Sequence, residues 1–197
     1  MMRRFLLSFV LAMCVVVTAR AEQDLYNPLA VGLRWDVDVD VKTLSGETLH
    51  GTAVREVTGT ETVNNHLYFV VLTSFTGLPT MKDTTMYRRK TARGVFAFSS
   101  LDTAKQEYLE AVLPLVVGQT WKTVVAGQPM TTTVEGKEAM TVGDKKYENC
   151  MKISYKASSG IVSGIYYQAP DVGNVLETTT VAGSVYTFTL KKFSGLK

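Results

Sequence analysis

Apolar and polar residues alternate along most of this chain with a period of two. The clearest case is the segment 35–41, where Trp35, Val37, Val39 and Val41 alternate with aspartates. Such alternation is typical of an antiparallel strand with one face on the core and the other in water. Almost no segment sustains the 3.6-residue period of a helix. The pattern therefore predicts an all-β protein.

Glycine, proline and asparagine residues divide the rest of the chain into short candidate strands. We expect these at 49–57, 67–72, 86–92, 95–99, 121–125, 130–134, 139–142, 146–156, 165–167 and 186–190. In 67–72 both alternating sets are apolar, which predicts a central strand covered on both faces. Residues 102–113 fit a short helix capped by Asp102, or equally a strand, so at most one short helix is expected.

One motif, Pro-Leu-x-Val-Gly-x-x-Trp, occurs twice, at 28–35 and at 114–121, and contains both tryptophans of the chain. Self-similarity of this kind predicts a duplicated β unit, with pseudo-repeats at about 26–112 and 113–193. No linker rich in proline, glycine or serine separates them, so residues 22–197 are expected to form a single all-β domain. We expect an antiparallel meander of two tandem similar halves that forms a curved sheet, a half-barrel or a barrel.

Residues 1–21 have the pattern of a secretory signal peptide. Arg3 and Arg4 precede an apolar run, which ends at the small-x-small sequence Ala19-Arg20-Ala21. The run is too short to span a bilayer, which needs about 20 apolar residues, and no other segment comes close. The sequence therefore predicts export to the periplasm or the cell exterior, with no transmembrane segment after cleavage.

The two cysteines have different expected fates. Cys14 has the spacing of a lipid-attachment box, so a membrane-anchored lipoprotein is an alternative, although the large Met13 before it favours simple cleavage. Cys150 then remains alone and cannot form an internal disulfide. We interpret it as a buried or edge thiol, and the alternative is an intermolecular disulfide.

Cleavage of the signal peptide would also change the net charge. It removes three of the 21 basic residues and none of the 18 acidic residues, which leaves 18 of each. A balanced chain has no overall field that attracts polyanions, so no nucleic-acid partner is expected. Arg88, Arg89, Lys90 and Arg93 form one local basic cluster, which we interpret as a solvated strand or turn face.

Two sets of residues resemble metal sites without matching them. Asp36, Asp38, Asp40 and Glu47 imitate the ligand spacing of a calcium loop, but Val41 stands where such a loop needs glycine. These aspartates fit the wet face of a strand, with basic side chains such as Lys42 as cross-strand partners.

Histidines and sequence motifs likewise indicate no reactive centre. His50 and His66 have no partner at the spacing of zinc ligands. A nucleophile elbow, a dinucleotide-binding fingerprint and a phosphate loop are also absent from the sequence. We expect no catalytic, metal or cofactor site and no enzyme, with a hydrolase assembled from distant residues as the remaining alternative.

Aromatic side chains are the remaining candidates for a function. They can fill the core of a β domain, or they can line an apolar concavity that holds a lipid or another hydrophobic partner. The candidates are Trp35, Trp121, Tyr166, Tyr167, Phe96 and Phe98.

Several motifs spread over the chain resemble a diffuse group of uncharacterised exported bacterial envelope proteins and lipoproteins. They begin at Tyr26-Asn27-Pro28-Leu29, Leu113-Pro114-Leu115, Tyr147-Glu148-Asn149-Cys150 and Tyr167-x-Ala169-Pro170. The resemblance implies an all-β fold and no established activity. A looser similarity is to curved-sheet periplasmic carriers of lipoproteins and lipids, and it is an analogy of architecture alone. We expect a non-catalytic protein that binds an apolar ligand, a lipid or an envelope protein, or alternatively an assembly module that acts through exposed strand edges.

Overall fold

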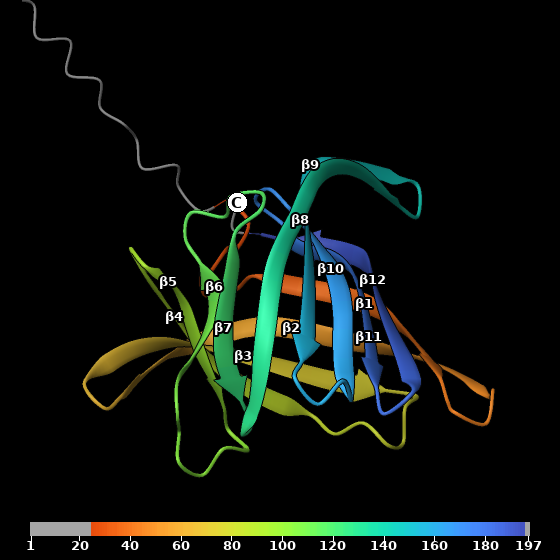
Figure 1. Ribbon diagram of the computed structural model, residues 1–197, viewed down its shortest axis with the longest axis horizontal. Coiled ribbons are helices and arrows are strands. Elements are labelled where there is room, and N and C mark those ends of the chain that lie inside the picture. The colour runs from red at the N-terminus through yellow and green to blue at the C-terminus, as the bar shows by residue number, and fades with distance from the viewer. Residues whose placement is uncertain (1–24, 196–197) are drawn as a thin grey trace, which may run out of the picture.

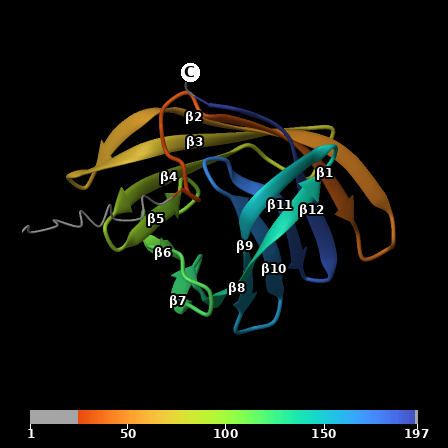
Figure 2. The same cartoon turned by 90° about the horizontal axis from the view of Figure 1, so that it is seen from above.

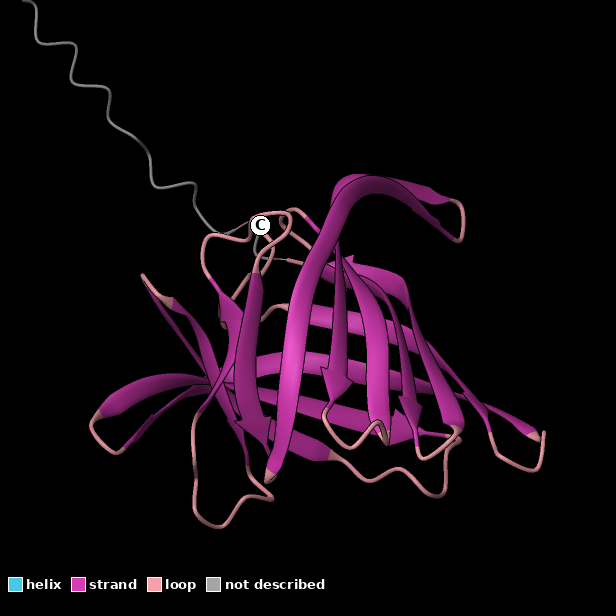
Figure 3. Cartoon of the chain, viewed as in Figure 1, coloured by secondary structure: helices cyan, strands magenta, loops and turns pink. Residues whose placement is uncertain are grey.

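A computed structural model describes residues 25–195 of the chain. Within these residues there are twelve strands and no helix (Figure 3). The strands are β1 (Arg34–Lys42), β2 (Thr48–Val63), β3 (His66–Thr76), β4 (Thr84–Thr91), β5 (Gly94–Ser99), β6 (Tyr108–Val112), β7 (Thr120–Val125), β8 (Gln128–Val142), β9 (Lys145–Ala157), β10 (Val162–Ala169), β11 (Gly173–Val181) and β12 (Ser184–Ser194). The all-β prediction is confirmed. The signal-peptide prediction and Cys14 lie outside the described residues.

All twelve strands belong to one antiparallel sheet. Its order is β6-β5-β4-β3-β2-β1-β12-β11-β10-β9-β8-β7, so the first and last strands pair in the middle. Each group of six consecutive strands is a meander: β1–β6 runs from the middle of the sheet to one edge, and β7–β12 runs from the other edge back to the middle. The sheet curls until the edge strands β6 and β7 lie next to each other, which produces a nearly closed barrel (Figures 1 and 2). This confirms the predicted curved antiparallel meander.

The two copies of the repeated motif make the same backbone contacts. Gly32 N–H donates to Val57 O and Gly118 N–H donates to Val134 O, each at 2.8 Å. The φ angles of these glycines are 89° and 85°, a region that favours glycine over residues with a Cβ atom. Each motif thus ties the entry of one strand, β1 or β7, to the strand that follows it. That the two halves come from one duplicated unit stays a prediction.

The segment 102–113 contains a turn and a strand. Both carboxylate oxygens of Asp102 accept backbone N–H groups, from Ala104 and Gln106 at 3.0 Å each. These bonds close a turn, after which the chain enters β6. Of the two alternatives for this segment, the strand is therefore the one that forms, over residues 108–112.

Strand β3 is paired on both sides, but its outer face is not covered by other elements. It pairs with β2 on one side and β4 on the other. Leu67 and Leu72 are nevertheless 61% and 36% exposed. The prediction that this strand is covered on both faces is wrong, because a barrel made of a single sheet has an outer face with no second layer over it.

Two clusters of buried side chains fill the barrel wall, and each combines both halves of the chain. Trp35 packs with Val57 and Val71 of the first half and with Cys150 and Val175 of the second. A second cluster surrounds Trp121. It contains Val95, Ala111, Leu115, Val134, Met151 and Ile153.

Cys150 belongs to the interior of this wall. Its side chain is fully buried, and burial raises the pKa of its thiol. Of the two interpretations of Cys150, the structure therefore agrees with the buried thiol. An intermolecular disulfide would first require the wall to open. No helix among the described residues is long and apolar enough to cross a membrane.

Candidate functional site

The barrel encloses a cavity of about 540 Å³. This volume lies within the range of roughly 300–1,000 Å³ that is usual for small-molecule sites. Strands of both halves line it, together with the N-terminal segment 26–29, and residues on both edge strands border it. Its apolar lining residues are Pro28, Leu29, Trp35, Met86, Val95, Leu109, Ala111, Val125, Ala126, Met130 and Val162.

Four charged side chains also line this cavity, and two of them form an ion pair. Arg88 of β4 donates from Nη2 to Oε1 of Glu110 on β6 at 2.5 Å. Their side chains are 23% and 26% exposed, so the pair is largely withdrawn from solvent. The ion pair joins the two strands that flank β5 in the sheet, close to the open seam.

Glu177 of β11 is held by neutral groups. Its carboxylate accepts hydrogen bonds from Thr179 Oγ1 at 3.2 Å, Tyr155 OH at 3.3 Å and Asn174 Nδ2 at 3.4 Å. These three donors fix the carboxylate at the cavity wall. Arg55 is the fourth charged residue of the lining.

Three tyrosines contribute polar groups to the cavity without adding charge. Burial raises the pKa of Tyr108, Tyr155 and Tyr166 well above the usual range of a phenol. Their hydroxyl groups therefore stay protonated at physiological pH and can donate hydrogen bonds. The cavity is thus apolar over most of its wall, with a few polar groups at fixed positions, which is the usual composition of a small-molecule site.

The aromatic residues singled out from the sequence lie in three different environments. Trp35 and Tyr166 line the cavity. Trp121 and Phe98 are buried outside it, at 6% and 1% exposure.

The other two aromatic candidates are half-buried and do not line the cavity. Tyr167 packs against the Trp35 cluster. Phe96 lies below the guanidinium group of Arg89, whose Cζ is 4.9 Å from the ring centroid. The structure therefore does not bring the six candidates together as one site.

The interpretation of the basic cluster as a solvated face is wrong for two of its members. Arg88 points into the barrel in phase with Met86, and both line the cavity. Arg89 points the other way, where its Nη2 donates to Glu107 at 2.7 Å and its side chain is only 20% exposed. Strand alternation explains the difference, because successive side chains lie on opposite faces of the sheet.

The charged lining residues were not among the candidates from the sequence. One signal could have identified Arg55, which stands between Ala53 and Val57 on an alternating strand. Those two neighbours are buried, so the same phase places Arg55 on the inner face. Glu110 gave no such signal, because β6 is short and its neighbours on both sides are apolar.

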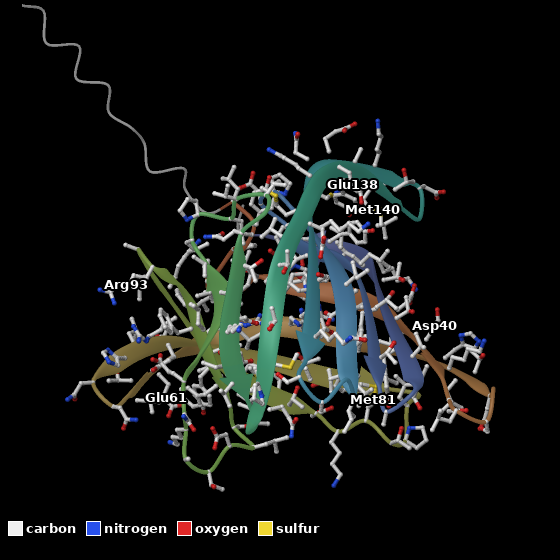
Figure 4. All side chains as sticks on the ribbon, viewed as in Figure 1. Asp40, Glu61, Met81, Arg93, Glu138 and Met140 are labelled. Carbon is white, nitrogen blue, oxygen red and sulfur yellow. The ribbon has the colours of Figure 1, made fainter. Side chains whose placement is uncertain are left out.

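The aspartates that imitate a calcium loop lie in β1 and form separate ion pairs. Asp36 contacts Arg34 at 2.9 Å and Asp38 contacts Lys191 at 3.4 Å. Asp40 lies 2.5 Å from Nδ1 of His50 and points away from the barrel (Figure 4). Lys191 and His50 are on neighbouring strands, as expected, whereas Arg34 is on β1 itself and Lys42 is not one of the partners. Among residues 25–195, no group of three or more histidine, cysteine or acidic side chains is placed to hold a metal ion.

A solved structure with a similar fold comes from a bacterial protein that is described as exported. A predicted exported protein with a YmcC-like fold from Bacteroides fragilis aligns with a TM-score of 0.54 at 12% sequence identity, over 87% of this chain and 100% of that one. This likeness shows the fold alone.

Two further solved structures align at lower similarity. A predicted lipoprotein from Parabacteroides distasonis has a TM-score of 0.47 at 13% identity, over 87% of this chain and 99% of its own. A β-barrel-like protein of the domain of unknown function DUF1849 from Brucella abortus has a TM-score of 0.48 at 11% identity, over 85% and 99% of the two chains. No protein-family model and no curated protein sequence matches the chain.

Proposed function

We propose that this protein is an exported cell-envelope protein that binds a small apolar or amphipathic ligand, such as a lipid, inside its barrel and does not transform it chemically. The observation that carries the proposal is the 540 Å³ cavity, which both halves of the chain enclose. Burial of an apolar ligand there would be favoured by about 25 cal/mol for each Å² of apolar surface removed from water. Export is supported by the pattern of residues 1–21 and by the description of the Bacteroides fragilis protein as exported.

The incomplete closure of the barrel supports a route into the cavity. Strands β6 and β7 are the two edges of the sheet and are not paired with each other. Residues 108–111 of β6 and Thr123 and Val125 of β7 border the cavity at this seam. Separation of the two strands would break no ladder of hydrogen bonds between them, so the seam is the least costly place for a ligand to enter.

The same arrangement makes an assembly module the less favoured alternative. A sheet recruits a partner strand through an edge that faces solvent. Here the two edges lie next to each other, as the view from above illustrates (Figure 2). A partner strand would have to insert between them instead of adding to a free edge.

A cavity-filling substitution tests the proposal. N-phenyl-1-naphthylamine, a neutral apolar fluorophore, is expected to bind the native protein at a single saturable site. Thr123→Trp, which places an indole in the cavity from β7, is expected to weaken this binding about tenfold or more, a loss of roughly 1.4 kcal/mol. The measurement is a fluorescence titration.

The neighbouring residue provides the matched control. Val124 lies on the same strand with the opposite orientation, outside the cavity lining and 52% exposed. Val124→Trp adds the same side chain to the outer surface and is expected to leave the titration unchanged. The proposal is wrong if the two variants bind the probe equally, or if the native protein does not bind it saturably.

A further inference from the structure

Arg55 is an uncommitted cation inside the barrel. It lies on the inner face of β2 and lines both the 540 Å³ cavity and a small pocket of about 20 Å³ that adjoins it. With the residues of 25–195 it forms no hydrogen bond and no ion pair. The other three charged lining groups are all held by partners, Arg88 and Glu110 by each other and Glu177 by three neutral donors.

A buried guanidinium without a partner is an unfavourable arrangement. Burial lowers the pKa of Arg55, and the positive charge of Arg88 lowers it further. Arginine nevertheless keeps its proton in proteins, so the charge stays in the cavity. Glu110 and Glu177 attract it from a distance, but neither carboxylate pairs with it directly.

Arg88 lines the same cavity and also has a donor without a partner among the described residues. Nε of Arg88 is buried and has no hydrogen-bond partner among the described residues, because Glu110 engages only the Nη2 end of the group. Two guanidinium groups therefore line one space, and Arg55 is the one that has no counter-ion within salt-bridge distance among the described residues. Planar guanidinium groups of this kind match the geometry of carboxylate and phosphate oxygens.

We propose that the ligand of this cavity is an amphipathic anion whose carboxylate or phosphate headgroup is bound by Arg55. This inference rests on the proposed function and adds the chemical class of the ligand. The apolar part of the molecule extends along the wall that Leu29, Met86 and Met130 contribute. The anion supplies the direct hydrogen-bonded partner that neither Glu110 nor Glu177 provides for Arg55.

The test compares ligands that share one alkyl chain and differ in the headgroup. The probes are dodecanoate, dodecyl phosphate and 1-dodecanol, titrated below their aggregation limits and followed by calorimetry. At least one anion is expected to bind about 10- to 100-fold more tightly than the alcohol, because a hydrogen bond to a charged group contributes about 1.5–3 kcal/mol. The stronger of the two anions then identifies whether the headgroup is a carboxylate or a phosphate.

Arg55→Gln is expected to remove this preference for anions and to leave the affinity for 1-dodecanol unchanged. Arg93→Gln is the matched control, since Arg93 is exposed at the tip of the β4–β5 hairpin and points outward (Figure 4). It is expected to keep the preference. Arg55→Gln also removes a desolvated charge, so its Tm is expected to equal or exceed that of the parent.

The outcomes separate this inference from the proposed function. If 1-dodecanol binds as tightly as both anions, the headgroup inference is overturned and the cavity proposal stands. If none of the three probes binds, both are overturned. A fall in the Tm of Arg55→Gln, or an anion preference that survives the substitution, would show that Arg55 has a structural role instead.

Discussion

Trp121→Ala is expected to lower the free energy of unfolding by about 3–5 kcal/mol, the usual loss for a buried tryptophan. Its side chain is 6% exposed and packs with Val95 and Ala111 of the first half and with Leu115 and Val134 of the second. No ladder joins β6 to β7, so this cluster holds the seam together by side-chain packing alone. Urea unfolding measures the change, and Leu44→Ala, at a 76% exposed position, is the control with little expected effect.

The equivalent tryptophan of the first half provides a sharper comparison. Trp35 Nε1 donates to Val172 O at 2.6 Å, whereas Nε1 of Trp121 has no partner among the described residues. Replacement by phenylalanine therefore removes a hydrogen bond only at position 35, and leaves the Val172 carbonyl unsatisfied. Trp35→Phe is expected to cost about 1 kcal/mol more than Trp121→Phe. Equal losses for the two variants would contradict this account of the two environments.

Glu110→Gln is expected to lower the free energy of unfolding by about 3 kcal/mol, because it leaves Arg88 in the cavity without its counter-ion. The expected loss is at the lower end of the range for breaking a buried ion pair, because both side chains keep some exposure to solvent. The double variant Arg88→Met with Glu110→Leu is expected to recover most of the loss, because no unpaired charge remains.

An exposed ion pair is the control for this substitution. Lys146 and Glu148 form a pair at 2.7 Å with side chains more than 60% exposed, so Glu148→Gln is expected to change stability little. Chemical denaturation of the three variants and the parent gives the comparison. If Glu110→Gln is as mild as Glu148→Gln, the Arg88–Glu110 pair is not desolvated and the interior is more open to water than the structure indicates.

Local pattern was sufficient to predict most of the strands. In β1, apolar residues alternate with aspartates, and this pattern predicts which face is buried. The structure buries Trp35, Val39 and Val41 as the pattern indicates. Such a pattern depends only on the pleat, which every strand shares. The repeated motif likewise marked the entry of β1 and β7, because a left-handed glycine and a buried tryptophan are needed at each entry.

The polar interior was not predictable in the same way. Alternation separates Arg88 from Arg89 but does not say which of the two faces is enclosed. The pairing of Arg88 with Glu110 also depends on a register shift between Val95 and Phe96, where β5 meets β6. A bulge of this kind has no reliable local pattern, and it decides which side chains of an edge strand enter the cavity.

The central claim, that the barrel encloses a bound ligand, is tested most directly by native mass spectrometry of the protein isolated from the cells that produce it. The account predicts a non-covalent adduct of one amphipathic anion per chain, present in the parent and in Val124→Trp and absent from Thr123→Trp. The bare polypeptide mass in all three proteins, with no adduct restored by dodecanoate or dodecyl phosphate, would contradict it.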